Sequence, residues 1–130
     1  MSKRLASLRR IGAVQDLIQR RAEAALAAAE RDKAAIEALR SELDGFAASD
    51  GLRGDLARLV EAQGRRLAER DAAAALEIER RTAVSRAART RHKLVDEARI
   101  RMERDEEVLA ERRDLERLIE DMTARAGSDG

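Results

Sequence analysis

Apolar residues recur at alternating spacings of three and four along residues 8–46, and this repeat constrains the fold more than any other feature. Ten of its twelve positions are apolar and seven of them carry large side chains. A repeat that averages 3.5 residues keeps its side chains on one face of a supercoiled α-helix. It therefore predicts a long amphipathic helix that packs lengthwise against another helix. The positions are Leu8, Ile11, Gln15, Ile18, Ala22, Ala25, Ala29, Asp32, Ile36, Leu39, Leu43 and Phe46.

The composition points to the same all-α fold. Strands favour β-branched and aromatic residues, and aromatic residues make up only 1% of the 130 residues. The chain has no proline to break a helix, and charged residues account for 41%. It also has no cysteine, which excludes disulfides and thiolate catalysis and argues against a structural zinc site.

One segment interrupts the repeat. Residues 44–54 read D-G-F-A-A-S-D-G-L-R-G and hold three of the seven glycines, a composition typical of a turn. A second repeat then includes Leu56, Val60, Gln63, Leu67, Arg70 and Ala74 and continues more raggedly from Val84 to about residue 126. The sequence predicts a single antiparallel coiled-coil hairpin over residues 1–130, with one helix at about 3–46, a turn at 47–53 and a longer helix at 54–126.

The two repeats can be paired by residue number. Helices joined by a short turn lie antiparallel, so with the turn near residue 50 facing residues should have numbers that add up to about 100. Leu43 then faces Leu56, Leu8 faces Val95, and the alanines at 22–29 face those at 72–75. Large residues meet large residues and alanine meets alanine, which favours a hairpin over a single long helix that dimerises.

This pairing leaves the second helix unpaired beyond about residue 98. The unpaired overhang still carries large apolar side chains, and an exposed apolar stripe usually marks a partner surface. The partner is either another protein or a second copy of the chain. The residues predicted to form this surface are Met102, Leu109, Leu115, Leu118, Ile119 and Met122.

Charge is segregated although the net charge is only +1. Residues 3–21 and 80–97, which the hairpin brings together, hold twelve basic and three acidic residues, whereas residues 105–121 hold eight acids and three arginines. We expect a basic belt that either binds an acidic surface or phosphates, or is simply a solvated face. Nucleic acid is the less favoured partner because no aromatic side chain can stack on bases there. The belt residues are Arg4, Arg9, Arg10, Arg20, Arg21, Arg80, Arg81, Arg86, Arg89, Arg91 and Lys93.

Residues with catalytic chemistry are scarce. His92 is the single histidine, and the chain has neither a glycine-rich phosphate loop nor a nucleophile motif. The acids around the turn, Glu42, Asp44, Asp50 and Asp55, are interpreted as helix caps and solubilising residues rather than metal ligands. A two-helix hairpin also offers no pocket that excludes water. We expect a protein that is not an enzyme and has no catalytic, metal-binding or cofactor-binding residues.

Three segments suggest a family. They are R-L-A-S-L-R-R at residues 4–10, the alanine-, glutamate- and arginine-rich first helix, and L-E-R-L-I-E at residues 115–120. In this layout the chain resembles the flagellar FliJ family and its type III secretion counterparts, although its turn is shorter and its second helix lacks aromatic residues. The resemblance implies a cytoplasmic stalk or adaptor, peripheral to the inner-membrane export apparatus, that contacts the hexameric export ATPase, the export gate and chaperones.

Two alternatives remain open on the residues alone. One is a nucleic-acid-associated basic coiled-coil protein, because the predicted belt could bind phosphates. The other is a self-assembling coiled-coil scaffold, because two overhangs could pack together. The first fifteen residues are basic and acid-free like a mitochondrial presequence, but the heptad register runs through them, so we interpret them as the start of the first helix.

Overall fold

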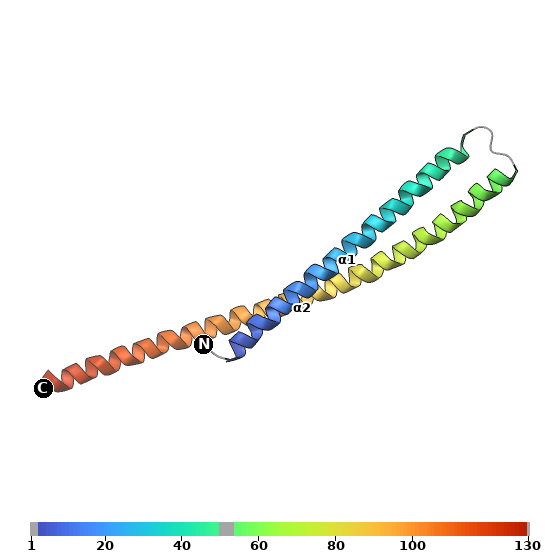
Figure 1. Ribbon diagram of the computed structural model, residues 1–130. Coiled ribbons are helices and arrows are strands. Elements are labelled where there is room, and N and C mark those ends of the chain that lie inside the picture. The colour runs from blue at the N-terminus through green and yellow to red at the C-terminus, as the bar shows by residue number, and fades with distance from the viewer. Residues whose placement is uncertain (1–2, 50–53, 130) are drawn as a thin grey trace. The chain divides into compact units, whose positions relative to one another are not determined.

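Two long helices make up the described part of the chain (Figure 1). The computed structural model describes residues 3–49 and 54–129. Helix α1 spans Lys3–Ala47 and helix α2 spans Asp55–Asp129, and no strand occurs among the described residues. The predicted all-α helical hairpin is confirmed. Part of the predicted turn, including Asp50, falls on residues 50–53, which lie outside the described residues.

Local hydrogen bonds mark the helix ends that flank the connection. After α1, the Ala48 amide donates to the Asp44 carbonyl at 3.0 Å, and the Ser49 hydroxyl donates to the Phe46 carbonyl at 2.6 Å. Before α2, Gly54 has a φ of 57°, a left-handed conformation that glycine adopts without the strain that a Cβ brings. Asp55 then places a negative charge in the first turn of α2, where the helix dipole favours it.

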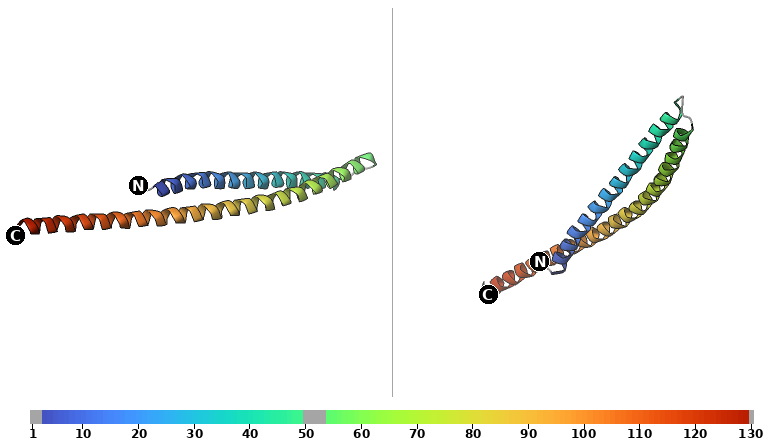
Figure 2. Two further views of the ribbon diagram at one scale, coloured as in Figure 1. Left: turned by 90° about the horizontal axis from the view of Figure 1, so that it is seen from below. Right: turned by 45° about the vertical axis from the view of Figure 1, so that its right-hand side comes forward.

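The chain divides into two compact units, each a pair of antiparallel helical segments. Unit 1 comprises Met1–Asp16 and Arg91–Gly130, and unit 2 comprises Leu17–Thr90. Within unit 1, α2 continues beyond the start of α1 (Figure 2), and every residue from 107 to 128 is exposed. We call residues 107–128 the arm. Among the described residues, no helix is both long enough and apolar enough to span a bilayer.

The helices pair in a register one heptad away from the predicted one. In unit 1, a Cβ added at Gly12 would lie 3.8 Å from Cγ1 of Val95. In unit 2, a Cβ added at Gly64 would lie 3.8 Å from Cδ2 of Leu43. Both pairs of numbers add up to 107 rather than about 100. The predicted pairs of Leu8 with Val95 and of Leu43 with Leu56 are therefore wrong. A shift of seven residues is two helical turns, so the shift by itself does not rotate either helix about its axis.

Half of the predicted stripe of α1 lies in the interface. One of its two columns is buried or half-buried, and the other is mostly exposed. The residues that follow the first five members of that second column take its place, and these five are all half-buried. The interface column contains Leu8, Gln15, Ala22, Ala29, Ile36 and Leu43; the mostly exposed column contains Ile11, Ile18, Ala25, Asp32, Leu39 and Phe46; the replacing residues are Gly12, Gln19, Leu26, Lys33 and Arg40.

Helix α2 repeats this displacement. Gln63, Arg70 and Val84 of the predicted stripe or its continuation are exposed, whereas the residue after each of them is buried or half-buried. Those following residues are Gly64, Asp71 and Ser85. The helices thus meet partly through small and charged residues, and large apolar side chains remain beside the interface.

Asp71 provides the physical reason for the observed register. Its side chain is only 20% exposed, and its carboxylate lies 3.3 Å from Lys33 Nζ and 3.0 Å from Arg40 Nη1. Lys33 and Arg40 lie one turn to either side of Ile36 on the face of α1 that meets α2. Their aliphatic stems cover the interface while their charges reach Asp71. A slide to the predicted register would place Asp71 between Leu26 and Lys33, and the contact with Arg40 would be lost.

We predict that Asp71→Ala lowers the thermal midpoint by about 3–6 °C, because it leaves two half-buried cations without their shared carboxylate. Circular dichroism during heating measures the change. The matched control is Asp32→Ala, which removes an exposed aspartate of α1 that directly precedes Lys33. Equal effects of the two substitutions would contradict the role given to Asp71.

We also predict that the observed register can be trapped by a disulfide in this cysteine-free chain. Gly12→Cys combined with Val95→Cys should oxidise readily, because the two side chains start within contact distance of each other. Leu8→Cys with Val95→Cys tests the register expected from the sequence and should oxidise more slowly. Mobility on a non-reducing gel after mild oxidation reports both; faster oxidation of the second pair would refute the register.

Candidate partner-binding surfaces

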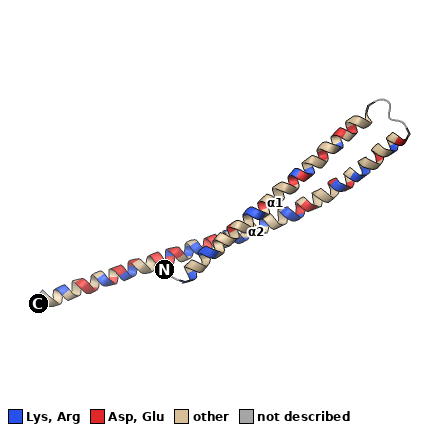
Figure 3. Ribbon diagram, in the orientation of Figure 1, with Lys and Arg blue, Asp and Glu red and all other residues tan. Residues whose placement is uncertain are grey.

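All eleven residues of the predicted basic belt are exposed. Figure 3 shows basic residues along both helices. The structure distributes the belt over both units, so it is described as two groups of cations. Unit 1 holds Arg4, Arg9, Arg10, Arg91 and Lys93, and unit 2 holds Arg20, Arg21, Arg80, Arg81, Arg86 and Arg89.

Acidic neighbours partly neutralise the belt. In unit 2, Arg80 and Arg81 lie 3.4 Å and 2.8 Å from carboxylate oxygens of Glu77, and Arg89 lies 3.6 Å from Glu23. In unit 1, Arg9 lies 3.2 Å from Glu103. These exposed pairs add little stability, but they reduce the positive potential that the sequence alone indicates. The cations with exposed side chains and no ion pair to another described residue include Arg21, Arg86, Arg91 and Lys93.

A polar cluster joins the two helical segments of unit 1. Glu103 accepts hydrogen bonds from Arg9 at 3.2 Å and from Arg99 at 3.0 Å, and Arg99 also donates to Asp96 at 2.7 Å. The hydrogen bond from Arg9 is the main cause that lowers the pKa of Glu103, with Arg99 adding to it and partial desolvation opposing it. Sequence reasoning missed this cluster because Arg99, like Asp71 and Ser85, does not belong to the predicted stripe of α2 and yet lies at the interface with α1.

The same cluster includes the single histidine. His92 Nε2 lies 3.6 Å from a carboxylate oxygen of Asp16, across the helix pair of unit 1. Together with Gly12, Ala13 and Arg99 these residues line a shallow hollow. His92 is thus half-buried at the helix interface. The arrangement is that of a structural polar contact between the helices.

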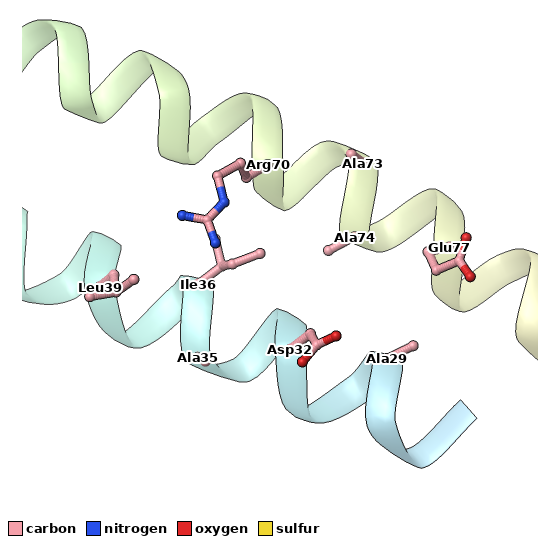
Figure 4. A pocket seen from close by; sticks show the side chains of 9 residues that line it. All are labelled: Ala29, Asp32, Ala35, Ile36, Leu39, Arg70, Ala73, Ala74 and Glu77. Carbon is pink, nitrogen blue, oxygen red and sulfur yellow. The ribbon is translucent and has the colours of Figure 1, made fainter. Parts of the chain in front are cut away.

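A groove runs along one side of unit 2 (Figure 4). It has a volume of about 540 Å³ and an apolar base that includes Ala29, Ile36 and Ala74. Leu39 of α1 lines one side, and Figure 4 shows Arg70 of α2 extending toward Ile36 from the other. A second hollow shares Leu39 and Arg70 and extends the groove as far as Phe46. The exposed apolar column of α1 therefore lines a groove that could accept side chains of a third helix.

The arm contains most of the predicted partner surface. Met102 is the exception, because it is half-buried beside Leu8 and Ile11 within unit 1. The other predicted residues have between 47% and 62% of their area exposed, and Val108, at 51%, belongs with them. They are Leu109 at 47%, Leu115 at 59%, Leu118 at 55%, Ile119 at 61% and Met122 at 62%.

The described residues include no group of three or more histidines, aspartates and glutamates placed to hold a metal ion. The candidate sites of this helical hairpin described above are charged and apolar surfaces. No protein-family model, curated protein or solved structure matches the chain. The FliJ-like resemblance stays a prediction based on residues 4–10, the first helix and residues 115–120.

We predict that Glu103→Gln destabilises the protein at neutral pH and that this difference disappears in acid. Because the folded-state pKa of Glu103 is lowered from 4.5, its ion pairs contribute stability above that pH and lose it as the pH falls through the folded-state value. Urea midpoints of both proteins between pH 7 and pH 3 test this. Glu107→Gln, which removes an exposed acid of the arm, should leave the midpoint unchanged; a pH-independent difference for Glu103→Gln would contradict the assignment.

Proposed function

We propose that the protein is a non-enzymatic coiled-coil adaptor or stalk subunit, similar to the FliJ-like component of the flagellar or type III export apparatus. In this role it contacts the export ATPase ring and the export gate or chaperones, in the cytoplasm or peripherally at the inner membrane. The observation that supports it best is the arm, a stretch of helix whose large apolar side chains are all exposed. Such side chains are typical of protein-interaction surfaces.

Two further observations support an interaction role. The hollows of unit 2 are open grooves between two helices, and a site of this kind excludes little water from a reacting group. Large apolar residues such as Leu39 and Phe46 remain exposed beside the interface rather than inside it. A helix pair with these features is better suited to packing against further helices than to binding a small substrate.

The nucleic-acid alternative is less well supported than the adaptor. Arg9, Arg80, Arg81 and Arg89 share their charge with nearby carboxylates, so fewer cations are available to phosphates than the sequence suggested. The scaffold alternative has the arm in its favour, but the charges of the arm oppose self-pairing, as shown below. We therefore retain the adaptor as the proposed function.

We predict that reversing the charge of belt cations outside the ion pairs weakens binding to the export ATPase or gate protein of the same organism by at least about tenfold. The variant combines Arg86→Glu, Arg91→Glu and Lys93→Glu. Binding to the purified partner is measured by isothermal titration calorimetry, and circular dichroism checks that helicity is retained. The charge-matched control combines Arg58→Glu, Arg65→Glu and Arg66→Glu, which are exposed and outside the belt.

Absence of binding between the unaltered chain and either export protein would overturn the proposed function. Equal loss in the two triple variants would show that the belt is only a solvated face. A steep fall in DNA binding with rising salt, close to one slope unit per phosphate contacted, would instead favour the nucleic-acid alternative.

A further inference from the structure

The apolar side chains of the arm lie on a different face of α2 from the one that meets α1. In unit 1, that interface includes Val95, Arg99, Met102 and Glu106, which are all half-buried. The same heptad row continues into the arm, but there it turns polar after its first residue: Leu109, Arg113, Glu116, Glu120 and Thr123.

The apolar row of the arm lies one residue earlier in the sequence. It contains Val108, Leu115, Ile119 and Met122, with Leu118 beside it, and Arg112 interrupts it between Val108 and Leu115. One residue of an α-helix is a rotation of about 100°, so this row does not point along the direction in which α1 lies. A helix packed on the arm stripe, as we call these five apolar residues, would approach α2 from another side and would not extend the position of α1.

One edge of the arm stripe is strongly acidic. The residues that directly precede the row positions in the sequence include four exposed acids, Glu107, Glu111, Asp114 and Asp121. Among the residues that the structure describes, none forms an ion pair with these four acids. The stripe therefore combines large apolar side chains with a line of carboxylates on one side.

This charge pattern opposes pairing of the arm with a second copy of itself. In a parallel pair of arms, Arg112 would face Arg112 of the other copy and Glu111 would lie beside Glu116. In an antiparallel pair, the acidic edges of the two copies would lie side by side. Either arrangement brings like charges together, whereas a helix with basic flanks would meet opposite charges along the whole edge.

We propose that the arm is the docking surface for a basic amphipathic helix of another protein. The apolar face of that helix packs on Val108, Leu115, Ile119 and Met122, and its lysines and arginines lie along Glu107, Glu111, Asp114 and Asp121. Recognition of this kind places apolar anchors at spacings of three and four in contact with an apolar stripe. The inference rests on the proposed adaptor function and deepens it, because it names the chemistry of one partner.

The test uses the full chain and two labelled synthetic helical peptides, each of about 20 residues, long enough to cover roughly 30 Å of the arm. Both peptides carry leucine at the two apolar heptad positions; one has lysine and arginine at the flanking positions and the other has glutamate. Fluorescence anisotropy measures their affinity for the chain. We expect the basic peptide to bind at least about tenfold more tightly than the acidic one, with the difference shrinking as salt is raised.

Two pairs of variants assign the binding to the arm stripe. Leu115→Ser with Ile119→Ser should weaken the basic peptide at least about tenfold, whereas Leu94→Ser with Ile100→Ser, exposed outside the arm, should change it less than about twofold. Glu111→Lys with Asp114→Lys should weaken it likewise and improve binding of the acidic peptide. Glu116→Lys with Glu120→Lys alters two acids away from the acidic edge and should have a smaller effect.

Three outcomes would overturn the proposal. They are failure of the basic peptide to bind, equal affinity for the two peptides, and light-scattering masses that show a dimer abolished by Leu115→Ser with Ile119→Ser. The last outcome would assign the arm stripe to a second copy of the chain. None of these results depends on the export proteins, so a failure here leaves the adaptor proposal standing, and loss of that proposal leaves the peptide result interpretable.

Discussion

The carboxylate of Asp71, shared by Lys33 and Arg40, is the contact on which the pairing of the helices in unit 2 depends. Alanine-rich faces pack in many registers, because a small side chain fits opposite almost any neighbour. A half-buried carboxylate does not have that freedom, since it costs free energy wherever it meets no cation. Compared with the registers one heptad away on either side, only the observed register places Asp71 between two basic residues, Lys33 and Arg40. The ion pairs thus select an arrangement that the alanines alone leave undetermined.

The fold could be predicted from the sequence because helix formation is a local matter. The absence of proline, the abundance of alanine and the glycines around residue 50 determine two helices and a turn without reference to their packing. The register could not be predicted in the same way. Matching large residues with large ones uses side-chain size alone, and that criterion ranks Leu43 opposite Leu56 above the observed Leu43 opposite Gly64. The observed register depends on charged contacts between residues far apart in the chain.

The candidate surfaces could likewise be predicted only in part. The exposed apolar residues of the arm could be predicted, because α1, when paired with α2 from the turn, does not extend as far as the arm. The assignment of Met102 to that surface was wrong, since the heptad shift extends the helix pair of unit 1 past it. The belt residues could be identified as exposed, but their pairing with Glu23, Glu77 and Glu103 could not, because it depends on which turns lie opposite one another.

The charged residues between the helices and the apolar residues outside them have a common consequence. A hairpin that buried Ile11, Leu39 and Phe46 between its helices would gain apolar contact, at about 25 cal/mol for each Å² removed from water. This chain instead places Gly12, Arg40 and residues like them at the interface, and keeps those large side chains at its sides. The hairpin alone therefore leaves much of its available apolar stabilisation unused. A partner that covers the exposed stripes would add that stabilisation to the folded state only, so such binding would be thermodynamically linked to folding. The linkage is a physical reason why an adaptor can be built from a helix pair that is itself modestly packed.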